Sequence, residues 1–260
     1  MLLEGKKLVI TGVVTHSSIA WHVARIAQEE GAEVVLTSFG RGMRLTERAS
    51  KRLPVPTDVL ELDINVQEHM DAVVADLESR WGVVHGALHA IAYAPQDALG
   101  GNFLNTPAES AVIAFQTSAF SYKTLAVGLA PLMRAAGGGA LVTLDFDNSQ
   151  AWPIYDWMGV AKSALQSVTR YLARDLGADK IRVNAVSAGP LSTVAAKSIP
   201  GFRSLEKAWL ERSPIEWDST DPAPVAQMVA LLLSDWTPMT TGEVVHVDGG
   251  FHSLAAGSRE

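Results

Sequence analysis

The stretch KKLVITGVVTHSSIAW (6–21) decides the fold, because a short apolar run passes through one glycine into a helical pattern. KKLVIT (6–11) predicts a buried strand, and Gly12 permits a tight turn. The apolar residues of 17–31 fall on one helical face, and a serine pair is placed to cap the helix start. Such a helix N-terminus presents free backbone N–H groups to a phosphate. Only one glycine of the usual G-x-G-x-x-G is present, so an ordinary structural turn stays open as an alternative.

Short apolar runs and helical patterns continue to alternate along the chain. Further strands are predicted at 33–38, 58–63, 86–92, 139–146, 181–188 and 243–250. Helices are predicted at 109–134 and 155–177, from Asn65 with Glu68 as a capping box, and from Asp221 with Pro222 and Pro224 to Leu233. This alternation predicts a Rossmann-like, doubly wound α/β fold, with a parallel seven-stranded sheet covered by helices on both faces. We expect a single domain over 1–260, with ligands at the carboxyl ends of the strands.

Composition argues against several classes of function. The 260 residues are 48% hydrophobic, enough for a sizeable core, and the net charge of −7 argues against a nucleic-acid or anionic-membrane surface. There is no cysteine, and the seven histidines form no HxxxH or HExxH pair, so no metal site is expected. The apolar run at the N-terminus is too short for a signal peptide, and no run is long enough to span a membrane. A cytoplasmic protein is therefore expected.

The ends of the first three strands suggest where the adenosine and phosphates of a dinucleotide would lie. Gly12 is followed by Ser18 and Ile19 at the predicted helix start. After the second strand, Phe39 stands where an NAD-preferring fold often has an acidic residue, and its ring suits stacking on adenine. Arg41 can meet a 2′-phosphate, so the cofactor is not decided by this stretch. Asp63 can accept the exocyclic amine of adenine, and Ile64 can cover its ring.

The ends of the later strands suggest the nicotinamide and substrate region. Ala90, Ile91 and Ala92 are small or apolar, which suits a ribose that passes close to the backbone, and Tyr93 and Pro95 can wall a substrate pocket. After the sixth strand, AGPLST (188–193) forms a turn whose members can contact the cofactor, namely Gly189, Pro190, Leu191 and Thr193.

YDWMGVAK (155–162) places a tyrosine seven residues before a lysine. Seven residues make nearly two helical turns, so Tyr155 and Lys162 share one face, about 10 Å apart along the axis. We expect the Lys162 ammonium to lie below the Tyr155 hydroxyl and to favour its ionised form. A tyrosine placed in this way can donate a hydrogen bond or proton to an oxygen that gains negative charge. An ordinary helix with a solvated lysine is the alternative, and the position after the fifth strand favours the functional interpretation.

Taken together, these residues resemble the short-chain dehydrogenase/reductase superfamily. Within it they are similar to the single-domain enoyl-acyl-carrier-protein reductases of bacterial fatty-acid synthesis. The resemblance covers essentially the whole chain, through G-x5-S-I-A (12–20), Tyr155-x6-Lys162, AGPLST and TTGEVVHVDGG (240–250). The carbonyl-reducing branch has a serine about thirteen residues before the tyrosine, where this chain has Val142. Phe146 stands nine residues before the tyrosine, at the place of an aromatic residue in the enoyl reductases.

The resemblance implies a mechanism. Hydride passes from NADH, or from NADPH as the alternative, to the β-carbon of a trans-2-enoyl thioester bound to acyl carrier protein. Tyr155 would hydrogen-bond the resulting enolate oxygen, Lys162 would hold the nicotinamide ribose, and Phe146 would orient substrate or cofactor by packing. Met158 is expected in the substrate pocket.

A substrate-covering segment over 191–217 is also implied, with Ala195 and Ile199 toward a short or medium acyl chain. Its basic residues Lys197, Arg203 and Lys207 can face the acidic carrier protein. A homotetramer is expected from the resemblance.

Two other functions stay open from the sequence. One is a carbonyl reductase of the 3-oxoacyl type, against which Val142 argues. The other is a non-catalytic dinucleotide-binding regulator, which the presence of both Tyr155 and Lys162 disfavours.

Overall fold

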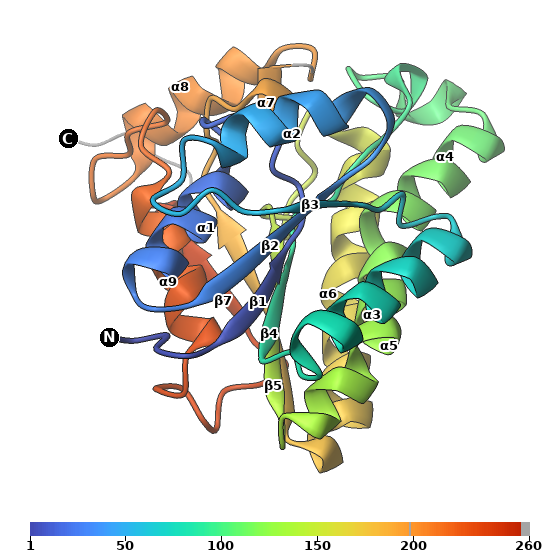
Figure 1. Cartoon of the computed structure of the whole chain (residues 1–260). Coiled ribbons are helices and arrows are strands. Elements are labelled where there is room, and N and C mark those ends of the chain that lie inside the picture. Colours follow the sequence, from blue (N-terminus) through green and yellow to red (C-terminus); the bar gives the residue numbers. More distant parts are fainter. Residues whose placement is uncertain (198, 256–260) are drawn as a thin grey trace.

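The computed structural model describes residues 1–197 and 199–255, and one parallel sheet runs through the middle of the molecule (Figure 1). Its seven strands follow the order β3-β2-β1-β4-β5-β6-β7, and every neighbouring pair is parallel. They are β1 (Lys7–Ile10), β2 (Glu33–Ser38), β3 (Val59–Glu61), β4 (Gly86–His89), β5 (Gly139–Asp145), β6 (Ile181–Ala188) and β7 (Val244–Val247). The order reverses at β1, so a crevice is expected beyond the carboxyl ends of β1 and β4. The predicted fold class is confirmed.

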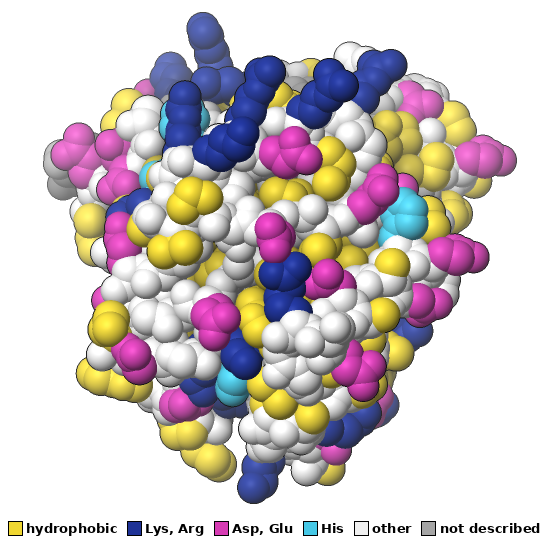
Figure 2. Space-filling view, viewed as in Figure 1, with side chains coloured by type: hydrophobic (Ala, Val, Ile, Leu, Met, Phe, Trp, Pro, Cys, Tyr) yellow, Lys and Arg dark blue, Asp and Glu magenta, His cyan; other side chains and the backbone are white. Residues whose placement is uncertain are grey.

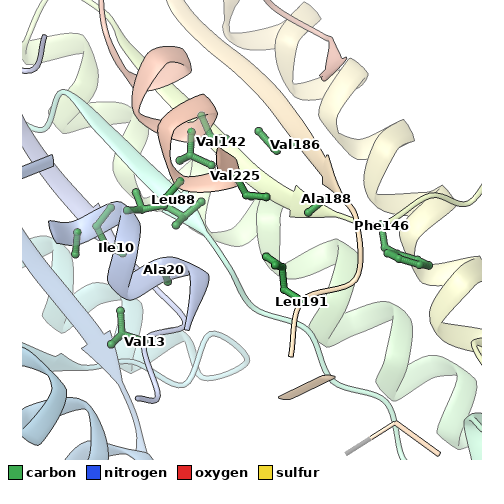
Figure 3. Packing of buried hydrophobic residues seen from close by; sticks show 14 of the residues in the cluster. Ile10, Val13, Ala20, Leu88, Val142, Phe146, Val186, Ala188, Leu191 and Val225 are labelled. Carbon is green, nitrogen blue, oxygen red and sulfur yellow. The ribbon is translucent and has the colours of Figure 1, made fainter. Parts of the chain in front are cut away.

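Helices cover both faces of the sheet. One face carries α1 (Ile19–Glu29), α2 (Met43–Ser50) and α9 (Ala223–Leu233), and the other carries α3 (Gln67–Trp81), α4 (Ala108–Phe115), α5 (Ser121–Ala135) and α6 (Asp156–Leu176). Figure 3 shows the first of the two cores, where Leu88, Val142 and Val186 of the sheet meet Ala20 and Val225 of the helices. The predicted helix that ends at Leu233 is confirmed.

The capping box predicted at Asn65 is wrong. Helix α3 begins at Gln67, and no side chain caps its N-terminus. The Asn65 backbone N–H donates to Asp63 Oδ1 over 3.0 Å, and its amide donates to Thr117 Oγ1 over 3.3 Å. The residue therefore forms a local turn after β3, which competes with a capping role.

The helix predicted at 109–134 contains an irregular turn. Between α4 and α5 the chain forms a π-helical turn, η4 (Gln116–Phe120). Such a turn changes the direction in which the following side chains leave an otherwise regular helix. Here Ser118 and Ser121 point to the chain that leaves β4, as described below.

The predicted strand 86–92 ends earlier, at His89.

Helix α2 was not predicted, because it lies on the outside and buries only Thr46, Ala49 and Ser50.

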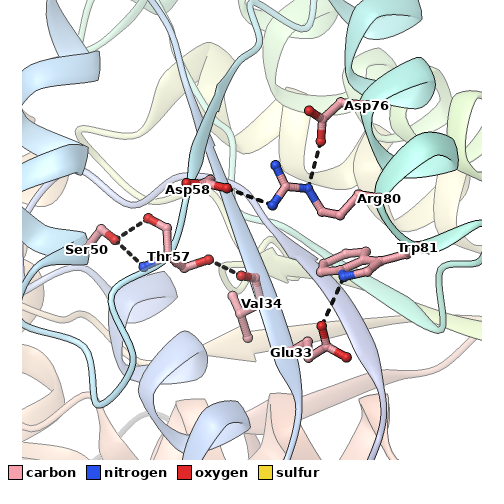
Figure 4. A network of polar contacts seen from close by, with 8 residues as sticks. All are labelled: Glu33, Val34, Ser50, Thr57, Asp58, Asp76, Arg80 and Trp81. Atoms are coloured by element: carbon pink, nitrogen blue, oxygen red, sulfur yellow. Dashed lines mark hydrogen bonds and ion pairs between the residues drawn. The ribbon is translucent and has the colours of Figure 1, made fainter.

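The amino end of β3 is fastened by a polar network (Figure 4). Arg80 of α3 pairs with Asp58 at 2.7 Å and with Asp76 at 2.9 Å. Thr57 donates to the Val34 carbonyl, and its backbone N–H donates to Ser50 Oγ over 2.9 Å. These contacts hold a three-residue edge strand in which no residue is fully buried.

Short helices α7 (Val194–Lys197) and α8 (Phe202–Arg212) lie within the predicted covering segment, at the same end of the molecule as α2 (Figure 1). In residues 1–197 and 199–255, no helix is both long and apolar enough to cross a membrane.

Candidate active site

A cavity of about 530 Å³ opens at the carboxyl ends of β4 and β5, between helix α6 and the start of α7. It is lined by Ile19, Ala90, Ile91, Ala92, Tyr93, Ala94, Gln96, Leu99, Leu144, Asp145, Phe146, Tyr155, Met158, Lys162, Ala195, Ala196 and Ile199. We call it the α6 cavity. Apart from the two tyrosines, none of these described lining residues carries a hydroxyl group.

The α6 cavity brings together much of the predicted site. Five predicted cofactor residues line it: Ile19, Ala90, Ile91, Ala92 and Lys162. Of the predicted substrate residues, Tyr93, Phe146, Met158, Ala195 and Ile199 line it as well. Pro95 lies outside the lining, at the start of the short turn η2 (Gln96–Ala98).

The turn after β1 packs directly against the chain that follows β4. Gly12 has φ +80°, and a Cβ built on it would lie 2.0 Å from the Ala90 carbonyl oxygen. Thr11 Oγ1 donates to the Leu88 carbonyl over 3.0 Å and accepts the Ala90 N–H over 2.9 Å. The glycine is therefore required by both its backbone conformation and the close approach of the two strand ends.

Ser18 stands at the N-cap position of α1, but its side chain does not cap the helix. Its Oγ accepts the backbone N–H groups of Val14 and Thr15, each over 3.1 Å. The predicted capping role is therefore wrong. The serine instead folds the loop back on itself, so its side chain does not occupy the α1 N–H groups that an anion could use.

A second hollow of about 470 Å³ lies beside this loop, and we call it the polar hollow. It is lined by His16, Ser17, His22, Leu191, Ser192, Thr193, Lys197, Ser219, Thr220, Asp221 and Pro222. The polar hollow contains Leu191 and Thr193 of the predicted cofactor residues. Gly189 and Pro190 are not among its lining residues, and the Pro190 carbonyl accepts the Trp217 indole N–H over 2.8 Å.

The predicted adenosine residues lie outside both hollows. Phe39 is 53% exposed just before the short turn η1 (Gly40–Gly42). Ile64 is buried, and Asp63 Oδ1 accepts the Asn65 N–H.

Tyr155 and Lys162 both reach the α6 cavity, although not in the predicted electrostatic relation. Tyr155 is the N-cap residue of α6, and Lys162 Nζ donates to the Leu144 carbonyl over 2.8 Å. Burial raises the pKa of Tyr155 well above its usual range, and the charge of Asp145 raises it further. The prediction that Lys162 favours the ionised phenol is therefore wrong. In this site the hydroxyl stays protonated and can act as a donor.

Phe146 packs against Tyr155, and both rings line the α6 cavity. Their ring centroids are 4.9 Å apart, with an interplanar angle of 60°. Behind Phe146 lies an aromatic cluster in which Trp209 stacks on Phe251 at 3.8 Å and contacts Trp152 at 5.0 Å. The cluster joins the end of β5, helix α8 and the residues after β7, so it ties the covering segment to the sheet.

The π-helical turn η4 and the first residue of α5 hold β4 and the chain that follows it, part of which lines the α6 cavity. Ser118 Oγ accepts the Tyr93 N–H and donates to the Tyr93 carbonyl, each over 2.9 Å. Ser121 Oγ and Thr143 Oγ1 each lie 2.8 Å from a ring nitrogen of His89. Burial lowers the pKa of His89 to about 3, so this histidine is neutral and structural.

Two functional candidates were not found from the sequence. Asp145 and Gln96 line the α6 cavity, and Gln166 of α6 donates to Asp145 Oδ2 over 2.7 Å. Asp145 is the last residue of β5, so the rule that ligands lie beyond strand ends could have identified it. Nothing in the sequence pattern marks Gln166.

The residues present fit a dinucleotide. The ends of β1 and β4 meet at Gly12 without a side chain between them, and the small residues Ala90 and Ala92 then line the α6 cavity. Within residues 1–197 and 199–255, no group of three or more His, Asp or Glu side chains is placed to hold a metal ion.

Comparisons with known proteins identify similar chains. The family described as enoyl-(acyl carrier protein) reductase matches residues 12–252. An NADH-dependent enoyl-acyl-carrier-protein reductase of Mycolicibacterium smegmatis is 43% identical over 96% of this chain and 97% of its own. The NADH enzyme of Bacillus subtilis is 37% identical over 97% and 98%. The NADPH enzyme of Staphylococcus aureus is 35% identical over 97% and 98%.

Proposed function

Because the chain belongs to the enoyl-(acyl carrier protein) reductase family, we propose that it reduces trans-2-enoyl thioesters with NADH in fatty-acid elongation. The observation that carries this proposal is the meeting of Tyr155 and Lys162 in one cavity that has no serine or threonine among its described lining residues. A carbonyl reductase of the superfamily would need such a hydroxyl. Val142, where the sequence comparison expected that serine, is fully buried in the core of the sheet.

The proposed mechanism assigns one task to each side chain. When bound, the nicotinamide supplies a hydride to the β-carbon of the substrate. The Tyr155 hydroxyl donates a hydrogen bond to the thioester oxygen, which becomes anionic as the hydride arrives. Because this donor is buried and water is largely excluded, its contribution is larger than the same bond would make in water. Phe146 holds the phenol in place by ring contact and takes no part in proton transfer.

The dinucleotide would extend from the α6 cavity through the polar hollow to α2. Lys162 would hold the nicotinamide ribose, with Ala90 and Ile91 beneath it. The backbone N–H groups at the start of α1 and the Thr193 side chain would face the phosphates. Gly189, Pro190 and Leu191 would contact the nicotinamide end, while Phe39, Asp63 and Ile64 would contact adenosine.

NADH is the proposed cofactor, and NADPH is the alternative. Relatives of both kinds exist. Figure 2 shows Lys and Arg side chains gathered along the edge formed by α2, where Arg41, Arg44 and Arg48 are exposed. Arg41 and Arg44 follow Phe39 closely in the sequence and could contact a 2′-phosphate. The ratio of the affinity for NADH to the affinity for NADPH is therefore the deciding measurement.

The segment 191–217 would cover the substrate. Ala195, Ala196 and Ile199 line the α6 cavity from α7 and the residues after it, which suits an apolar acyl chain. The carrier protein would dock beside this segment, at the exposed cations Lys197, Arg203 and Lys207. Lys207 already pairs with Glu211 at 3.6 Å, so Arg203 is the stronger candidate.

A homotetramer is part of the proposal. Helices α4 and α5 and the turn between them expose large apolar side chains, namely Val112, Ile113, Phe115, Phe120 and Val127. Exposed apolar patches of this kind mark association surfaces. Phe115→Asp should lower the molecular mass measured by analytical ultracentrifugation, whereas Leu45→Asp on α2 should not.

The cytoplasmic location remains a prediction.

A direct assay tests the activity. The protein is mixed with NADH and crotonyl or octenoyl thioester, and the loss of nicotinamide absorbance is followed. Consumption of the enoyl thioester but not of acetoacetyl thioester supports the proposal. Consumption of acetoacetyl thioester alone would identify a carbonyl reductase, and cofactor binding without either reaction would identify a binding protein.

A further inference from the structure

Asp145 is a buried carboxylate at the end of β5, in the wall of the α6 cavity. Only 5% of the residue is exposed. The proposed mechanism gives it no task. A carboxylate is costly to bury unless its oxygens are paired, so its presence beside Tyr155 and Lys162 requires an explanation.

The two oxygens of Asp145 are in different situations. Oδ2 accepts the Gln166 amide over 2.7 Å and the Asn148 amide over 3.3 Å. Oδ1 is fully buried and has no hydrogen-bond partner within the described part of the chain. One oxygen is therefore held in place by the protein, while the other has no hydrogen-bond partner. Burial raises the pKa of Asp145, and the charge of Lys162 and the Gln166 hydrogen bond oppose that change.

Lys162 lines the same cavity and is the cation whose charge acts on Asp145. It is 6% exposed, and its Nζ donates to the carbonyl of Leu144, the residue just before Asp145. An ammonium has three donors and one carbonyl uses only one of them. Burial lowers the pKa of Lys162, and among the described residues Asp145 is the carboxylate whose charge opposes that change.

Two further titratable groups beside Lys162, His89 and Tyr155, carry no charge near neutral pH. His89, on β4, faces the ammonium but has a pKa of about 3. Burial raises the pKa of Tyr155, at the start of α6, so its hydroxyl is protonated. Asp147, after β5, influences Asp145 and is not among the cavity-lining residues. Asp145 and Lys162 are therefore the carboxyl and the amine among the described residues that line the α6 cavity.

We propose that Asp145 is a positioning residue of the reductive site, whose buried carboxylate keeps Lys162 as an ammonium directed at the bound dinucleotide. Gln166 fixes the carboxylate from the next turn of α6. The inference rests on the proposed function, because it requires a dinucleotide in the α6 cavity. It goes beyond that function by adding a residue pair, Asp145 and Gln166, to the cofactor machinery.

The test is the pH dependence of NADH affinity, measured by fluorescence titration from about pH 6 to about pH 10. In the Asp145→Asn protein, the alkaline loss of affinity should move to lower pH by about one unit, because the buried ammonium has lost its counter-charge. Asp145→Glu keeps the charge and should restore most of the wild-type profile. Asp145→Ser provides a second neutral variant if the asparagine protein does not fold.

Asp147→Asn is the matched control. Asp147 is also buried and also has one unpaired oxygen, but it does not line the α6 cavity. Its variant should keep the wild-type profile. The inference is overturned if a folded Asp145→Asn protein, checked by near-ultraviolet circular dichroism, has a profile that coincides with wild type or loses affinity equally at every pH. A wild-type protein that binds no dinucleotide would overturn the proposed function itself.

Discussion

The rings of Phe146 and Tyr155 lie 4.9 Å apart, so the buried phenol rests against a side chain that has no proton to give. Tyr155 is then the proton-bearing group that faces the substrate from this wall. We expect Tyr155→Phe to lower the single-turnover rate of enoyl reduction about 10²-fold, because one donor to the developing oxyanion is lost. Affinity for NADH should stay unchanged, because Lys162 remains. An unchanged rate would remove the hydroxyl from the mechanism.

Phe146 should act on the reaction through geometry. Phe146→Leu keeps an apolar side chain but removes the ring contact with Tyr155, so we expect kcat/KM for octenoyl thioester to fall about 10-fold, with little change in NADH affinity. Trp152→Leu is the control, since Trp152 contacts Phe146 at 5.9 Å but is not among the residues that line the α6 cavity. Equal losses in both variants would show that general packing of the aromatic cluster, rather than support of Tyr155, is responsible.

The sheet was predictable because most residues of its buried parallel strands are apolar. The limits of 33–38 and 181–188 match β2 and β6, where turn residues or charges bound each apolar run. Helix α2 escaped prediction for the opposite reason. It has only eight residues, is polar on average and exposes Arg44 and Arg48 to solvent, so it lacks the longer apolar pattern by which the other helices were predicted.

The sequence could predict which strand ends contribute residues to the site, but it could not predict the contacts that those residues make with one another. Helical spacing places Tyr155 and Lys162 on one face, yet it does not say where a flexible ammonium will point. In the structure that ammonium binds the Leu144 carbonyl, and the group that acts on Tyr155 is Asp145. Such relations depend on tertiary contacts between β5 and α6, which no local pattern contains.

Gly12 should be intolerant of any side chain. An alanine Cβ there would meet the Ala90 carbonyl oxygen at 2.0 Å, in addition to the strain of φ +80°. We expect Gly12→Ala to lower the free energy of unfolding by about 3 kcal/mol and to weaken NADH affinity at least about 10-fold. Gly137→Ala separates the two causes, because Gly137 also has φ +80° but has open space around it. Gly137→Ala should lower the free energy of unfolding, measured by urea denaturation, by about 1 kcal/mol and should leave NADH affinity unchanged.

His89 should make the fold sensitive to acid. Its pKa is lowered to about 3 by burial, from 6.5 in the unfolded chain. A depressed folded-state pKa means that the unfolded chain binds the proton first, so the stability contribution is complete above pH 6.5 and is lost as pH falls toward about 3. The free energy of unfolding should then decline by up to about 1.4 kcal/mol for each pH unit in this window. His22, His85 and His246 have lowered pKa values too and add slopes of the same sign.

The variant His89→Gln isolates the contribution of His89. It cannot titrate in this range, although it loses some stability at every pH because the bonds to Thr143 and Ser121 are disturbed. The difference between wild type and variant, measured by urea denaturation at a series of pH values, should therefore shrink as the solution is acidified. A difference that stays constant with pH would mean that His89 takes up its proton in the folded protein as readily as in the unfolded chain, and the buried pair of hydroxyl contacts would then hold an imidazolium.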